Sequence, residues 1–413
     1  MLKAKAENNE LKYDFLLKLS TAYFATHISL DGFLALMPFL REEFSLSGAQ
    51  AGLYSTFYFF TATIVAIFSG RVVDMIGSKK GVVFGAGSIG ILMFFHASAP
   101  NFKMILLLAL FTGLSFSIIT PSLNKAIMKK VKPQNRALSM GLMQSGGGVG
   151  GVLGASLLPL LGGVIGWRIA VLLSGFTALL ISIFIFKFYH EDSVYEKAEE
   201  KNKETSFFKS IGVLFKNKYL MLVCLLGLGF GTSIGAIPAH FTLYLTQDLS
   251  ISKSLAGVGL GILHTGGIVG RPAWGWISDR FLGGSRRKGL IIVGAFFVII
   301  SSVFAFYITK FASSVIVIYV FSFLLGLTGF GWMGIYFTTV AELASAKYTG
   351  IATGLALIFT RSGVVISPPV FGYLADINQS YWLSWLAISI LILIFTVGFS
   401  YISGKFFTED KQI

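Results

Sequence analysis

The chain has 413 residues, of which 54% are apolar and only 13% charged, and it contains 40 phenylalanines and 47 glycines. Soluble globular domains carry about 25% charged residues, so this composition excludes a soluble globular protein and indicates a polytopic membrane protein. The formal net charge of +14 would also suit a nucleic-acid-binding protein, but the distribution of basic residues described below indicates membrane topology instead.

Charge-free stretches long enough to cross a bilayer recur along the chain. A transmembrane helix needs about 20 predominantly apolar residues. Stretches of that length between charged residues are 44–70, 81–102, 104–124, 137–167, 219–247, 289–309, 311–341 and 377–404. Shorter or interrupted apolar segments begin near Lys18, Ile169, Ser254 and Gly350. Together they predict an all-α integral membrane protein with twelve transmembrane helices.

The apolar pattern stops between His190 and Lys218, where lysines and glutamates predominate. A segment of this composition cannot bury an apolar face, so we expect a solvated, charged linker on the cytoplasmic side. The sequence therefore predicts two six-helix bundles, residues 1–190 and 218–413, joined by a linker at 191–217.

Basic residues predict the orientation of the chain. If the N-terminus is cytoplasmic and the spans alternate, the outer side holds only Arg41, Lys103, Arg168, Lys253 and Lys310. Most other lysines and arginines then lie on the inner side, as the positive-inside rule requires. We therefore expect both termini in the cytoplasm. The polar N-terminus lacks a signal-peptide pattern, so we expect the first span to insert a multi-pass protein into a bacterial plasma membrane, the inner membrane.

A loop rich in glycine and charge occurs once in each half. The first copy follows the second predicted span and contains Gly70, Arg71, Asp74, Gly77 and Lys79. The second copy follows the eighth predicted span and contains Gly275, Asp279 and Arg280. Equivalent residues lie 205 positions apart, as 70 and 275 do and as 74 and 279 do. Duplicated bundles around a midplane site are typical of secondary transporters.

The loop pattern G-x-x-x-D-x-x-G-x-[KR]-[KR] resembles the signature between the second and third spans of major facilitator transporters. Two copies in register extend this resemblance over the whole chain. Ser78 replaces the usual basic residue, and the second copy has one additional residue before its glycine. The resemblance implies the major facilitator fold of two pseudo-symmetric six-helix bundles, and transport by alternating access.

In that family the loop aspartate faces a helix N-terminus in the opposite bundle. The resemblance therefore implies that Asp74 faces the helix beginning near Thr349 and that Asp279 faces the one near Leu138. A carboxylate at a helix N-terminus contributes about 0.3 to 1 kcal/mol when exposed and up to about 2 when partly buried. The loops would then be latches that favour the outward-open state, with close helix approach at Gly70. The alternative is that these charges only anchor the topology.

Arg271 lies inside an otherwise apolar segment, eight residues or about 12 Å of helix before Asp279. A charge at membrane depth costs at least about 2.5 to 3.5 kcal/mol and is usually functional. His264 shares its helix face, two turns earlier. The sequence Gly270-Arg271-Pro272 resembles the eighth span of the oxalate:formate antiporter and of monocarboxylate transporters, which implies that Arg271 binds a substrate carboxylate through its guanidinium fork.

A second intramembrane arginine, Arg361, lies in the eleventh predicted span, where the oxalate transporter carries a lysine in a similar setting. Arg271 and Arg361 together would suit a dianion, or a carboxylate with a second polar group. Two alternatives remain open. Either arginine could be neutralised by a buried carboxylate, and Arg361 could instead donate to backbone carbonyls freed by Pro368 and Pro369.

The opposite wall of the site is expected to come from the first half. His27 and Asp31 lie four residues apart in the first predicted span and share a helix face. Asp31 is the first candidate for the coupled proton and His264 the second; alternatively, Asp31 ends the polar part of the helix, and His27 is an ordinary hydrogen-bonding residue. Gln144 and Tyr336 are candidate cavity-lining residues.

A competing hypothesis is a proton-coupled exporter of drugs or other lipophilic compounds. The glycine run 146–154 suits it, but the Gly-Pro pair of those exporters is missing, and Ala109 stands where their fourth-span arginine is expected. Helix packing through small residues is the favoured interpretation of the run. No nucleotide-binding loop of the G-x-x-x-x-G-K-[ST] type occurs, and the lone Cys224 gives neither a disulfide nor a thiol metal site.

The sequence thus predicts a secondary active transporter of a small organic anion, a mono- or dicarboxylate or a related anion. Transport would be symport or antiport, driven by protons or by a counter-substrate. We expect a monomer in the lipid bilayer, without enzymatic activity, cofactor, metal or nucleic-acid partner.

Overall fold

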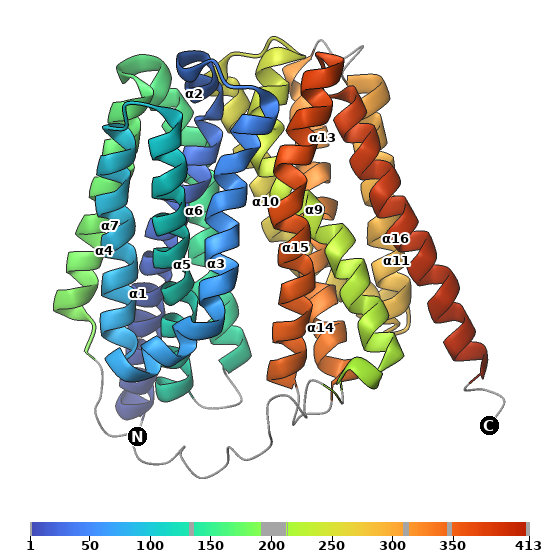
Figure 1. Cartoon of the computed structure of the whole chain (residues 1–413). Helices are drawn as coiled ribbons and strands as arrows, with labels where there is room; N and C mark the ends of the chain where they lie inside the picture. Colours follow the sequence, from blue (N-terminus) through green and yellow to red (C-terminus); the bar gives the residue numbers. More distant parts are fainter. Residues whose placement is uncertain are drawn as a thin grey trace. The chain divides into compact units, whose positions relative to one another are not determined.

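The computed structural model describes residues 2–131, 136–190, 212, 214–308, 314–344 and 349–409, and the regular structure in these ranges is entirely helical (Figure 1). The predicted linker at 191–217 lies largely outside the described residues. The helices of the first half are α1 (Leu2–Ala35), α2 (Met37–Phe44), α3 (Gly48–Ile76), α4 (Ser78–Ala97), α5 (Phe102–Lys130), α6 (Arg136–Ile165) and α7 (Trp167–Phe188). Those of the second half are α9 (Lys218–Gln247), α10 (Lys253–Phe281), α11 (Arg286–Val303), the π-helical turn η3 (Phe304–Ile308), α13 (Val315–Gly329), α14 (Trp332–Leu343), α15 (Thr349–Asn378) and α16 (Trp382–Glu409).

The helices confirm the twelve-span membrane fold predicted from the sequence. Within the described residues, nine helices are long and apolar enough to cross a membrane, and two bent pairs raise this number to eleven. The remaining long helix, α10, has 29 residues and carries the intramembrane Arg271. Its charges and glycines lower its hydropathy, while its length of about 43 Å suffices to cross a bilayer.

Four spans contain breaks that the apolar pattern does not predict, one of them a 64° bend within α3 between Gly48–Val65 and Phe68–Ile76. The first span bends by 47° between α1 and α2, next to Pro38, which lacks the backbone N–H that would bond to the carbonyl four residues earlier. The predicted span 311–341 is divided into α13 and α14 at Phe330 and Gly331. The ninth span ends in the π-helical turn 304–308.

The chain forms two compact units. Unit 1 comprises Met1–Phe44, Phe57–Asn202 and Lys253–Gly261, and unit 2 comprises Ser45–Thr56, Lys203–Ser252 and Ile262–Ile413. Two helices are divided between the units. The first turns of α3 belong to unit 2, and the first turns of α10 belong to unit 1.

In unit 1 the glycine run 146–154 places the backbone of α6 directly against α1. A Cβ atom added at Gly150 would lie 2.4 Å from the carbonyl oxygen of Phe24, and one at Gly154 would lie 2.5 Å from that of Ile28. Only glycine allows backbones to approach so closely. The favoured interpretation of the run as a helix-packing surface is therefore confirmed.

Unit 2 contains an equivalent contact between α9 and α15. A Cβ atom at Gly231 would lie 2.1 Å from the carbonyl oxygen of Thr360, and one at Gly235 would lie 2.3 Å from that of Val364. The first and fifth spans of each half are thus joined through glycines, which position the candidate residues of α1 within unit 1 and those of α15 within unit 2.

A carboxylate ties the end of the first span to the start of the sixth in each half. In unit 1, Glu43 accepts hydrogen bonds from the Trp167 indole at 2.6 Å and from the Arg168 guanidinium at 2.5 and 2.6 Å. In unit 2, Asp248 accepts one from the Tyr381 amide at 2.7 Å. Positions 43 and 248 are 205 apart, so the internal repeat found in the loops extends to these carboxylates.

Candidate functional site

Arg271 lies where α10 touches the junction of α13 and α14 in unit 2. A Cβ atom at Gly334 would lie 2.4 Å from the Arg271 carbonyl oxygen. Gly270 and Gly331 extend the same contact. A Cβ atom added to either glycine would lie less than 3.0 Å from the Cα atom of the other. Because backbone meets backbone on this side, the main chain at Arg271 is fixed in position. The side chain itself is partly buried.

His264 lies two turns before Arg271 on α10 and is also partly buried. Its ring centroid is 5.5 Å from that of Phe330, at an interplanar angle of 41°. Gly267, between the two candidates, also faces Phe330, with a hypothetical Cβ atom 2.8 Å from the Phe330 Cβ atom. The break between α13 and α14 thus supports the part of α10 that carries both candidates.

Arg361 lies on α15 in the same unit and is partly buried. In the structural alternative, Arg361 donates a hydrogen bond to a carbonyl freed by Pro368 or Pro369. Each proline frees the carbonyl of the residue four positions earlier. The carbonyl freed by Pro369, that of Val365, accepts a hydrogen bond from the Thr56 hydroxyl at 2.7 Å. This carbonyl therefore has a donor without Arg361, which weakens the structural alternative.

Tyr336 is fully buried within unit 2 rather than on a cavity wall. Its hydroxyl donates to the Ala356 carbonyl oxygen at 3.5 Å, and it fills the space left by Gly227, where a Cβ atom would lie 2.1 Å from the hydroxyl oxygen. Its ring packs at 5.2 Å from that of Trp332. These contacts give Tyr336 a packing role, and we do not include it in the proposed site.

His27 and Asp31 form a hydrogen-bonded pair on α1 in unit 1. The His27 Nδ1 atom is 2.9 Å from the Asp31 Oδ2 atom, and the side chains are 25% and 17% exposed. The predicted shared helix face is therefore confirmed. The imidazole lies 4.9 Å from the Tyr23 ring and edge-on to Phe116 at 5.9 Å. Aromatic neighbours and a carboxylate partner fix the orientation of this histidine.

Gln144 has an exposed side chain on α6, three residues before Gly147. Gly147 supports the histidine directly, because a Cβ atom there would lie 2.7 Å from the His27 Cδ2 atom. The structure thus brings α6 close to the pair through a glycine, while the role of Gln144 stays a prediction.

The first charged loop is tied within unit 1. Lys125 donates to the Asp74 carboxylate at 3.0 Å and to the Val73 carbonyl oxygen at 3.1 Å. Gly77 has a φ angle of +88°, which confirms the need for glycine at this turn. The close helix approach expected at Gly70 was wrong for this structure, because no atom lies within 4 Å of a Cβ atom placed there.

The other charged residues of the loops lie at the surface. Lys79 lies over the Phe186 ring at 5.2 Å, whereas Arg71 and Arg280 are exposed. Gly275 resembles Gly70 in having open space at its Cβ position. The contacts expected between Asp74 or Asp279 and helix starts of the other half would join the two units, and they stay predictions.

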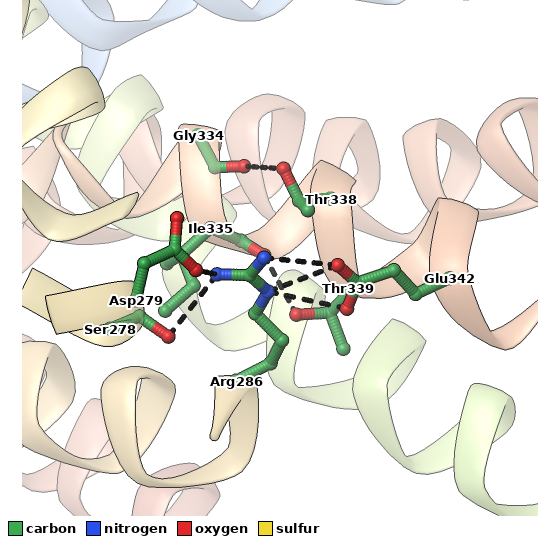
Figure 2. Close-up of polar contacts among 8 residues, drawn as sticks. All are labelled: Ser278, Asp279, Arg286, Gly334, Ile335, Thr338, Thr339 and Glu342. Carbon is green, nitrogen blue, oxygen red and sulfur yellow. Dashed lines mark hydrogen bonds and ion pairs between the residues drawn. The ribbon is translucent and has the colours of Figure 1, made fainter. Parts of the chain in front are cut away.

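The second charged loop is organised by Arg286, at the start of α11 (Figure 2). Its guanidinium donates to Asp279 at 2.5 Å, to Ser278 at 3.3 Å, and to Glu342 at 3.0 to 3.2 Å. Figure 2 shows the nearby hydroxyls of α14 donating instead to carbonyls of their own helix. Arg286 thus ties the ends of α10 and α14 together.

Sequence reasoning missed Glu342 as a partner of this loop. One signal was available, since Glu342 is the only acidic residue between 311 and 347. Within the described residues, no group of three or more histidine, cysteine, aspartate or glutamate side chains is arranged to hold a metal ion.

Comparison with known families gives an extensive match. The model of the Major Facilitator Superfamily matches residues 19–368 and, in a second match, residues 241–411. The two matches together cover nearly the whole chain, including both charged loops and both intramembrane arginines.

Three relatives share between 22% and 24% of their residues with the chain. A hexuronate transporter of Bacillus subtilis (strain 168) is 22% identical, over 82% of this chain and 82% of that protein. The multidrug resistance protein 1 of the same organism is 24% identical, over 88% and 90%. A gentisate transporter of Corynebacterium glutamicum is 23% identical, over 86% and 81%.

A solved structure of a bacterial homologue of the human lysosomal transporter Spinster, inward-facing and unoccupied, matches with a TM-score of 0.78. The identity is 16%, and the match covers 97% of this chain and 98% of that chain. At this identity the likeness concerns the fold, and it agrees with the twelve spans described above.

Proposed function

The chain belongs to the Major Facilitator Superfamily, and we propose that it is a secondary active transporter of a small organic anion, a mono- or dicarboxylate. Family membership makes it a multi-pass membrane transport protein and not an enzyme. The anion and the coupling are the proposed part. The observation that carries the proposal is Arg271, a cation at membrane depth on a helix whose backbone is fixed by glycines.

The position of Arg271 supports a binding role. Its helix ends at Phe281, near the ion pair of Asp279 with Arg286, so Arg271 lies about 12 to 15 Å of helix inside that end. An arginine at such depth is costly unless it faces a partner or a polar cavity. A carboxylate suits it because the planar guanidinium donates two parallel hydrogen bonds.

The relatives support the same class of substrate. Hexuronate and gentisate, the compounds in the names of two of them, both carry a carboxylate. Arg361, the second intramembrane arginine of unit 2, would provide further positive charge for a dicarboxylate. We propose His264 as a further substrate contact, because it shares the helix face of Arg271.

The hydrogen-bonded pair of His27 and Asp31 supports proton coupling as the driving mechanism. A partly exposed carboxylate hydrogen-bonded to an imidazole provides two groups that can exchange a proton. We propose that Asp31 carries the coupled proton. From the positive-inside rule we also propose that both termini lie on the cytoplasmic side of a bacterial plasma membrane.

A second candidate function is the export of lipophilic compounds with proton coupling. It is favoured by the match to multidrug resistance protein 1 over 88% of this chain. Arg271 and Arg361 favour an anion, and Ala109 stands where the fourth-span arginine of such exporters is expected.

A thermal-shift screen of the purified protein separates the two candidates. A ligand at 100 times its dissociation constant stabilises the folded state by about 2.7 kcal/mol. Monocarboxylates, dicarboxylates, sulfonates and lipophilic cations would be tested at equal concentrations. Stabilisation by a carboxylate supports the proposed function, and stabilisation by lipophilic cations without any anion contradicts it.

A further inference from the structure

The first turns of α3 lie against the last turns of α15 in unit 2. A Cβ atom at Gly48 would lie 2.7 Å from the Gly372 carbonyl oxygen, and one at Gly372 would lie 2.2 Å from the Gly48 carbonyl oxygen. A Cβ atom at Gly52 would lie 2.5 Å from the Pro368 carbonyl group. With the hydrogen bond of Thr56 described above, these contacts form a continuous seam, which we name the α3–α15 seam (residues 48–56 and 365–376).

One carboxylate closes the end of this seam. The Asp376 Oδ1 atom accepts the Gly48 N–H at 2.6 Å, and the Oδ2 atom accepts the Ala49 N–H at 2.9 Å. The first amides of a helix have no acceptor within the helix. A carboxylate there also interacts favourably with the helix dipole. Asp376 therefore joins the two helices through two charge-assisted hydrogen bonds.

Unit 1 contains the repeat equivalent of this seam, between the first turns of α10 and the last turns of α6. Gly257, 205 positions after Gly52, would place a Cβ atom 2.6 Å from the Ala155 carbonyl oxygen. The Ala155 carbonyl thus takes the place that the Pro368 carbonyl has in the α3–α15 seam. These two positions are 213 apart, and the same offset relates Gly163 to Asp376.

The two seams thus differ in their closing residue. Gly163 offers no side chain, and a Cβ atom there would lie 3.0 Å from the Ser254 hydroxyl oxygen. At this end of unit 1, Lys253 instead forms an ion pair with the exposed carboxylate of Glu42. An exposed ion pair of this kind contributes little to the stability of the folded state. Of the two seams, only the α3–α15 seam is closed by a carboxylate that accepts hydrogen bonds from two backbone amides.

We propose that Asp376 is the clamp that holds the α3–α15 seam closed, and that its two hydrogen bonds set how often the seam opens. The remainder of α3, from Phe57 onward, belongs to unit 1. Because the equivalent seam has no such clamp, Asp376 sets the balance between the closed and open states. This inference does not depend on the substrate being an anion.

Ser55 provides a reporter for the opening of the seam. It lies between Gly52 and Thr56, its side chain is 1% exposed, and its hydroxyl makes no hydrogen bond in the described structure. Ser55→Cys is close to isosteric and removes no contact. The chain has one other cysteine, the buried Cys224, which is replaced by alanine in the background. A membrane-impermeant thiol reagent then labels position 55 only when the seam is open.

The experiment compares labelling rates in intact cells for the Ser55→Cys reporter alone and with Asp376→Asn. Asparagine keeps one acceptor oxygen but places an amide N–H₂ group against the second backbone N–H. We expect the labelling rate to rise about tenfold, as the loss of one charge-assisted hydrogen bond predicts. Asp376→Glu keeps the charge on a longer side chain and should give an intermediate rate, which keeps the test available if Asp376→Asn does not reach the membrane.

Asp248→Asn is the matched control. Asp248 also accepts hydrogen bonds at a helix start in unit 2, from the Ser380 hydroxyl and the Tyr381 amide, but it joins α9 to α16. The Asp248→Asn substitution should leave the labelling rate unchanged. The clamp is refuted if Asp376→Asn labels at the rate of the reporter alone, or if Asp248→Asn raises the rate equally, because the effect would then be general loosening.

Discussion

The contact between α1 and α6 allows a quantitative prediction for Gly150→Ala. The added Cβ atom would lie 2.4 Å from the Phe24 carbonyl oxygen, whereas ordinary contacts begin near 3.4 Å. The neighbour is backbone and cannot rotate away, so the helices must separate locally by about 1 Å. Overpacking of this kind costs about 1 to 3 kcal/mol. With an unfolding entropy of about 2.1 cal/mol/K per residue over 413 residues, we expect the melting temperature to fall by roughly 1 to 4 °C.

The assay is thermal unfolding of purified protein in detergent, with Gly398→Ala as the control. Gly398 lies within α16 and has no atom within 4 Å of its Cβ position, so alanine there should be neutral or stabilise by up to about 1 kcal/mol through helix propensity. Equal melting temperatures for Gly150→Ala and the parent protein would refute the argument that glycine is required at this contact.

Three further predictions concern charged residues. In a double-mutant cycle of Arg286→Gln and Glu342→Gln, thermal unfolding should give a coupling energy of only about 0.2 to 1 kcal/mol, because the carboxylate is half exposed; additive effects would contradict the ion pair of Figure 2. Asp31→Asn should abolish pH-driven accumulation of substrate in vesicles while preserving exchange between preloaded pools, and retained accumulation would eliminate Asp31 as the proton carrier. Arg361→Lys should weaken substrate binding less than Arg271→Lys does, and the reverse order in a binding titration would exchange the roles of the two arginines.

The sequence was sufficient for the span count and the internal repeat because both depend on local composition. Long apolar stretches identify spans without any knowledge of packing, and the 205-position spacing is visible in the residues themselves. The glycine run 146–154 was also interpretable, since small residues on a membrane helix favour close packing. The pair of His27 and Asp31 followed from helical periodicity alone.

Contacts between distant segments were not predictable in the same way. The association of residues 45–56 with α15, and the role of Glu342, depend on which helices meet, and periodicity does not encode this. Spans in lipid are apolar on nearly all faces, so they lack the amphipathic pattern that identifies a buried face in soluble proteins. Tyr336 illustrates the difficulty, because the same aromatic residue suits a cavity wall and the packed interior in which it lies.

The most direct test of the proposed function is the affinity of Arg271 variants for the carboxylate that stabilises the parent protein in the screen. Arg271→Gln should weaken binding by about ten- to a hundredfold, because a hydrogen bond to a charged group contributes about 1.5 to 3 kcal/mol. Arg271→Lys should give an intermediate loss, since lysine keeps the charge but not the planar fork. Arg280→Gln, which removes an exposed arginine from the same helix, should bind as the parent does. Parental affinity in a well-folded Arg271→Gln protein would contradict the anion site.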